Sequence, residues 1–161
     1  MIRQNDWKKK LFWTAVVILY VGFIFHNSFT PAIESSKQSG GVLEMVLKTT
    51  SLLKIKSGWI TEHLIRKTAH FAEYLLFGIL LGIAIRQYSL ELKLRKVCQC
   101  WIGTMVPLTD ETIQLFSEGR SGQVSDVWLD MSGVLTGFLL IGIWLWVSKK
   151  KTAGADRRKR N

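Results

Sequence analysis

Hydrophobic residues occur in four long runs, separated by basic or polar stretches. A helix rises about 1.5 Å per residue, so about 20 apolar residues cross the hydrocarbon core of a bilayer. The runs predict transmembrane helices over residues 11–28, 68–86, 97–116 and 127–148. The third is the weakest, because it carries Asp110 and Glu111 and is interrupted by Pro107. We therefore expect an all-α fold: an integral membrane bundle of four transmembrane helices, forming one domain over residues 1–161.

The connection over residues 29–66 is the only long one. Pro31 and the pair Gly40-Gly41 predict breaks in it, and the polar residues 34–39 between them predict a loop. From Val42 onward, apolar residues recur every three or four positions. This spacing predicts an amphipathic helix that lies in the membrane interface or caps the bundle.

The distribution of Lys and Arg indicates the orientation. With a cytoplasmic N-terminus, the inner side receives four basic residues from the N-terminal segment, four from the 86–96 loop and seven from the tail over 149–161, which is 15 of the 22. The positive-inside rule favours this arrangement, with both termini cytoplasmic and the 29–66 connection outside. No small-x-small cleavage site follows the first run, so we interpret it as a retained anchor and not as a signal peptide.

The net charge of +10 raises the possibility of nucleic-acid binding. The basic residues sit beside apolar runs and in the tail, and zinc-ligand spacing, aromatic-basic patterns and Gly-rich phosphate loops are absent from the sequence. We therefore expect no nucleic-acid partner. Cys98 and Cys100 are two residues apart, which places them on different faces of a helix at the reducing, cytoplasmic end, so neither a disulfide nor a metal site is expected.

The polar residues within the predicted spans gather at one end of the bundle. With the expected topology this is the outer end, whereas residues 77–85 and 134–147 in the inner halves carry no charge. The candidate binding residues are Lys67, His70, Glu73, Asp110, Glu111, Gln114, Arg120, Asp126 and Asp130. Charged groups inside a membrane are costly and commonly functional, so we expect these side chains to form one outer pocket. An unpaired carboxylate at this depth is costly, so we expect Glu73 and Glu111 to pair with Lys67, His70 or Arg120.

Helical spacing supports a shared pocket. Asp126 and Asp130 are four residues apart and can point the same way. Gly133 and Gly137 continue the stripe of Asp130, and Gly-x-x-x-Gly lets another helix approach closely, which would carry Asp130 to the interior.

Simpler structural roles exist for several of these groups. His70 and Glu73 could form a structural ion pair, Asp126 could cap the last helix, and Arg120 could pair with Asp126 on the surface. The Arg66 side chain is expected to extend along the helix so that its guanidinium reaches the membrane–water interface.

Ordered motifs resemble one known family. The run from Arg66 to Tyr74 resembles the K-x-x-H-F-x-x-Y motif of the VanZ-like family, and His26-Asn27-Ser28 resembles the ending of its first helix. Residues 110–116, Gly119-Arg120 and residues 126–133 resemble its D-E-x-x-Q-x-F, G-R and D-x-x-x-D/N-x-x-G signature. Many members have Asn where this chain has Asp130. The resemblance implies a bacterial cell membrane protein with a role in the cell envelope, in a family associated with resistance to teicoplanin-type lipoglycopeptide antibiotics.

Two functions follow as hypotheses. In the first, the outer pocket binds a membrane lipid, a lipid-linked cell-wall precursor or the lipoglycopeptide antibiotic itself. In the second, the protein is an enzyme acting on a lipid phosphate, with His70, Glu73, Glu111 and Asp130 as catalytic candidates. The acids suit Mg²⁺ or Ca²⁺, and His70 permits Zn²⁺ or Mn²⁺, so a divalent cation is a possible cofactor. The sequence carries no hydrolase nucleophile motif, so we favour a binding protein over an enzyme. The lack of a visible inverted repeat argues against a transporter.

Overall fold

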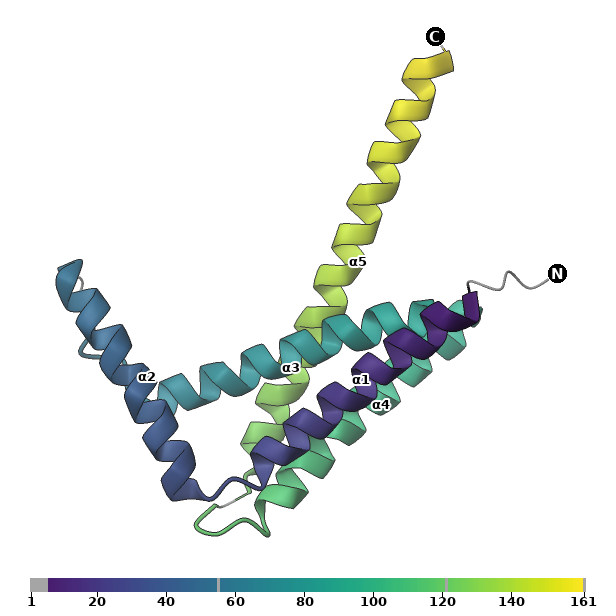
Figure 1. Cartoon of the computed structure of the whole chain (residues 1–161). Helices are drawn as coiled ribbons and strands as arrows, with labels where there is room; N and C mark the ends of the chain where they lie inside the picture. The colour runs from purple at the N-terminus through teal and green to yellow at the C-terminus, as the bar shows by residue number, and fades with distance from the viewer. Residues whose placement is uncertain (1–5, 55, 121, 161) are drawn as a thin grey trace.

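All the regular secondary structure in the residues that the structure describes is helical. The computed structural model describes residues 6–54, 56–120 and 122–160, with side chains up to residue 151. Its helices are α1 (Asp6–Ser28), α2 (Ala32–Leu52), α3 (Glu62–Arg86), α4 (Leu92–Gln114) and α5 (Val124–Arg160). This confirms the all-α class (Figure 1).

Three of these helices are long and apolar enough to cross a membrane. They are Asp6–Ser28, Glu62–Arg86 and the Val124–Lys151 part of α5. Large apolar side chains on their outer faces are exposed, for example Leu19 on α1 and Leu139 on α5. An apolar outer surface of this size suits contact with lipid and not with water. The fourth helix, α4, carries the buried acids Asp110 and Glu111 and does not reach the same apolar character.

The segment after Pro31 differs from its sequence-based prediction. The loop predicted over residues 34–39 is wrong, because α2 is helical from Ala32 and continues through Gly40 and Gly41. Pro31 stands at the N-cap, where its missing N–H costs nothing. The Ser39 hydroxyl donates to the Ser35 carbonyl within the helix, 3.0 Å away, so its polarity does not break the helix. The helix is therefore about ten residues longer than the pattern from Val42 indicates.

The other helices also extend beyond the apolar runs. α3 begins at Glu62 and not at residue 68, because the Thr61 hydroxyl accepts a hydrogen bond from the Leu64 amide at 3.2 Å and caps the helix. α5 begins at Val124, so Asp126 lies inside its first turn and is not the N-cap residue.

The packing of α3 against α5 is the most extensive contact between helices. Glycines allow it on both sides: a methyl group on Gly133 would lie 2.7 Å from the Phe71 carbonyl oxygen, and one on Gly137 would overlap the Leu75 carbonyl. Gly78 on α3 meets the Val134 carbonyl in the same way. This close approach confirms the packing predicted from Gly133 and Gly137, and it buries Asp130, which is 1% exposed.

The hydrophobic core lies between α1, α3, α4 and α5. Its buried members are Ile24, Tyr74, Phe77, Leu81, Ile85, Val106 and Val134. α1 lies beside α4, α3 crosses α5, and the C-terminal half of α5 extends away from the other helices (Figure 1). The end of α1, the end of α4 and the start of α5 meet the first half of α3, and we call this region the polar end.

Candidate functional site

A polar cavity opens at the polar end. It has a volume of about 150 Å³ and receives side chains from α2, α3, α4, α5 and the loop between the last two. Seven of the predicted site residues line it: Lys67, His70, Glu111, Gln114, Arg120, Asp126 and Asp130. Groups that are far apart in the sequence therefore share one cavity, as the sequence predicted.

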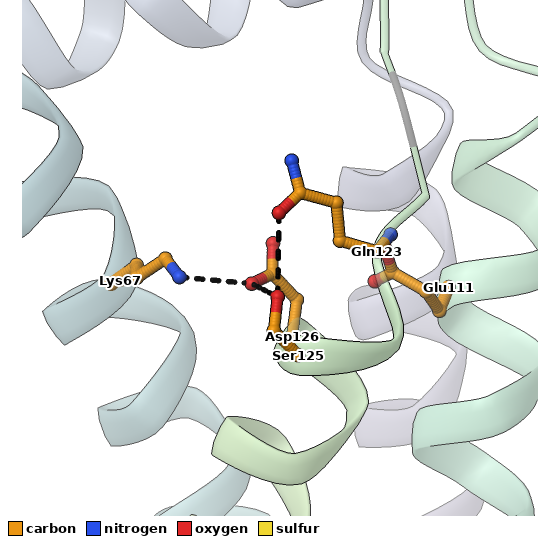
Figure 2. Close-up of polar contacts among 5 residues, drawn as sticks. All are labelled: Lys67, Glu111, Gln123, Ser125 and Asp126. Carbon is orange, nitrogen blue, oxygen red and sulfur yellow. Dashed lines mark hydrogen bonds and ion pairs between the residues drawn. The ribbon is translucent and has the colours of Figure 1, made fainter.

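The mouth of the cavity is braced by an ion pair between two helices. Lys67 Nζ on α3 lies 3.1 Å from Asp126 Oδ1 on α5 (Figure 2). Ser125 Oγ lies 3.2 Å from the same carboxylate oxygen. Both partners are about one-third exposed, so the pair contributes little to stability but fixes where the two charges stand. The surface pair predicted as an alternative for Arg120 and Asp126 does not form.

Arg120 reaches the cavity from the loop between α4 and α5. Gly119, with φ of 73°, makes the tight turn before it, and a methyl group there would lie 3.2 Å from Ala32 Cβ. Burial lowers the pKa of the Arg120 guanidinium; the charge of Asp110 opposes this shift, and that of Arg66 adds to it. Among the described residues no carboxylate lies within ion-pair distance of Arg120. A partly desolvated guanidinium is thus held at the cavity without a fixed partner.

The floor of the cavity is a buried hydrogen-bond network around Asp110, which is fully buried. The Ser28 hydroxyl at the end of α1 donates to Asp110 Oδ1, and Gln114 Nε2 donates to Oδ2 at 3.2 Å. The Ser117 hydroxyl in turn donates to the Ser28 carbonyl at 2.6 Å. These bonds fix the position of the carboxylate and join α1 to α4.

Two further acids at the floor have unpartnered oxygens. Both carboxylate oxygens of Asp130, and Glu111 Oε2, are buried without a hydrogen-bond partner among the described residues. His70, Asp110 and Asp130 each offer one ligand atom, and these atoms lie within 4.8 Å of one another. Imidazole and carboxylate donors in such a group can hold a divalent cation.

The predicted pairing of the two glutamates is wrong. Glu73 does not line the cavity; its Oε1 accepts from Asn27 Nδ2 at 3.1 Å, on the side of α3 that faces α1. Glu111 Oε1 accepts the backbone N–H of Gln123 (Figure 2). Neutral amide donors therefore take the place of Lys67, His70 and Arg120, because α3 turns Glu73 away and the backbone at Gln123 lies against Glu111.

The sequence-based set missed several lining residues. They include Ser35, His63, Arg66 and Gln123. His63, Arg66 and His70 follow one face of α3, and the Thr61 cap was the signal that this face begins before residue 68. Ser35 was missed because its segment was predicted to be a loop.

One comparison with known proteins gives a match. No curated protein and no solved structure matches the chain. The family model VanZ/LLP1 matches residues 12–145, which include every residue that lines the cavity. The chain therefore belongs to the VanZ/LLP1 family.

Proposed function

We propose that the cavity binds the anionic, phosphate-bearing headgroup of a membrane lipid or of a lipid-linked cell-wall precursor. The proposal rests on the Arg120 guanidinium, which lies at a polar cavity beside membrane-capable helices and has no ion-pair partner among the described residues. Arg66 and Lys67 add two further cations to the lining. A planar guanidinium can donate two parallel hydrogen bonds to a phosphate, which makes it a specific ligand for this group.

We propose that the protein has four transmembrane spans, with α4 as the additional span beside α1, α3 and α5. We also propose that α2 is extracytoplasmic and lies along the outer interface as an amphipathic helix. In this topology both termini are cytoplasmic, and the cavity faces the outer leaflet of the bacterial cell membrane. The excess of Lys and Arg on the proposed inner side supports the orientation.

Labelling of single cysteines tests the topology. In a background with Cys98→Ser and Cys100→Ser, a membrane-impermeant thiol reagent on intact cells should label Ser39→Cys and leave Thr152→Cys unlabelled until the cells are opened. Labelling of both positions in intact cells, or of Thr152→Cys alone, would contradict this topology.

The biological role that we propose is resistance to teicoplanin-type lipoglycopeptide antibiotics, or homeostasis of the envelope that these antibiotics attack. Such antibiotics carry a lipid tail and act at the outer leaflet, where the proposed cavity lies. A protein that holds a lipid-linked wall precursor, or the antibiotic, at this leaflet can change how much of the antibiotic reaches its target.

Susceptibility assays test this role. Arg120→Lys should lose most of the resistance that the wild type confers, because an ammonium group cannot reproduce the two-point contact with phosphate. His70→Ala should do the same, whereas Arg86→Lys and His26→Ala, which are exposed and outside the cavity, should keep it. All four variants should reach wild-type abundance and melting temperature. Full resistance in both Arg120→Lys and His70→Ala would rule the role out.

A second candidate function is an enzyme that acts on a lipid phosphate at the same cavity. The grouping of His70 with Asp110 and Asp130 favours it, since an imidazole beside carboxylates can transfer protons or hold a metal. Release of inorganic phosphate from a polyprenyl diphosphate by the purified protein separates this candidate from simple binding.

A further inference from the structure

The buried acids at the floor present an electrostatic problem. Four carboxylates surround the cavity and its floor, those of Asp110, Glu111, Asp126 and Asp130, against three permanently charged cations. One cation, Lys67, is already paired with Asp126 at the mouth. The floor therefore lacks positive charge, and a buried carboxylate without a partner is costly.

Asp130 is the clearest case. It is 1% exposed, and neither of its carboxylate oxygens has a hydrogen-bond partner among the described residues. The glycines Gly133 and Gly137, which bring α5 against α3, place it there. Its oxygens lie beside Asp110, which is itself fully buried. Two buried acids side by side need a cation or a shared proton between them.

We infer that His70, Asp110 and Asp130 bind one divalent cation of the Mn²⁺ or Zn²⁺ class. An ion bonded to its donors at about 2.0–2.2 Å holds neighbouring donors about 2.8–3.6 Å apart. The three ligand atoms already lie within 4.8 Å of one another, so small side-chain rotations bring them into range. The imidazole nitrogen favours these ions over Mg²⁺ and Ca²⁺, which prefer oxygen ligands alone.

The surroundings support this set of ligands. Asp110 is oriented by the Ser28 hydroxyl and by Gln114, and metal-bound carboxylates usually carry such supporting hydrogen bonds. Three protein ligands leave coordination positions open toward the cavity, which His70 and Asp130 both line. The bound ion would then face an incoming phosphate from below while Arg120 faces it from the loop. The cation site needs no bound lipid, so it can be tested independently of the proposed function.

Metal titration of the full-length protein tests the site. The protein is purified in detergent with its affinity tag removed, stripped with a chelator, and titrated with Mn²⁺ and with Zn²⁺ by calorimetry. We expect one ion per chain for the wild type, and a dissociation constant at least about tenfold higher for Asp130→Asn and for His70→Ala. Glu118→Gln and His26→Ala, both exposed and outside the cluster, should bind as the wild type does.

The Asp130→Asn change keeps the shape of the side chain and removes a buried charge, so we expect this variant to fold. His70→Ala provides the same comparison on the other helix. The absence of stoichiometric binding to the wild type, or unchanged affinity in Asp130→Asn, would overturn the site and leave a shared proton between Asp110 and Asp130 as the explanation for the buried pair.

Discussion

Replacing Gly137 by Leu should remove most of the folded protein from the membrane. A methyl group at this position already overlaps the Leu75 carbonyl and would lie 2.8 Å from the Ile79 amide nitrogen. Both are backbone atoms, which cannot rotate away as a side chain can. Overpacking in a close interface costs about 1–3 kcal/mol and at times more. Here the steric conflict pushes apart α3 and α5, which share the most extensive interface, so we expect the upper end of that range.

The matched control for this change is Gly142→Leu on the same helix. A methyl group at Gly142 has no neighbour within 4 Å among the described residues, so this variant should keep wild-type abundance and melting temperature. The measurement is the yield and thermal unfolding of the purified protein in detergent. An unchanged melting temperature in Gly137→Leu would contradict the conclusion that close packing of α3 and α5 buries Asp130.

The sequence predicted the helices well where apolar residues alone determine them. α1 ends at Ser28 as predicted, and the stripe of Asp130, Gly133 and Gly137 correctly indicated which face of α5 is buried. Glycines that allow close approach of two backbones leave a clear trace in the sequence, because no other residue fits there.

Helix ends and polar partners were harder to predict. The first turns of α3 and the first ten residues of α2 are mostly polar. The helices predicted from apolar residues therefore left them out. A cap at Thr61 and intrahelical serine bonds determine these segments, and such local hydrogen bonds give only a weak sequence signal.

The partners of the glutamates illustrate a second limit. The position of Glu73 and Glu111 inside the predicted spans indicated that both need partners, but it could not identify these partners. The packing of α1 brings Asn27 to Glu73, and the backbone that leads into α5 brings the Gln123 amide to Glu111. Most predicted site residues did converge, since they share one depth of the bundle and helical spacing turns them inward.

The second large effect concerns Arg120, which we expect to supply the strongest contact to a bound phosphate. Arg120→Gln keeps a polar, hydrogen-bonding side chain, which is shorter, and removes the charge. A hydrogen bond to a charged group contributes about 1.5–3 kcal/mol, so affinity for a phosphate lipid should fall about tenfold or more. The loop should keep its shape, because Gly119 makes the turn and Glu111 holds the Gln123 amide. Lipid retained by the purified protein, measured by native mass spectrometry, reports this loss.

We propose that the polar end binds an anionic phosphate headgroup and is not merely a structural network. Native mass spectrometry of the full-length protein tests it most directly, with phosphatidylglycerol, a polyprenyl phosphate and a neutral diacylglycerol glycolipid each added in equal amount. We expect the wild type and Arg86→Gln to retain one phosphate lipid in preference to the glycolipid. Arg120→Gln should lose this preference while its melting temperature is unchanged. The better retained of the two phosphate lipids shows whether a phospholipid or a wall-precursor carrier is the ligand. Equal retention of all three lipids by the wild type, or an undiminished preference in Arg120→Gln, would contradict the claim.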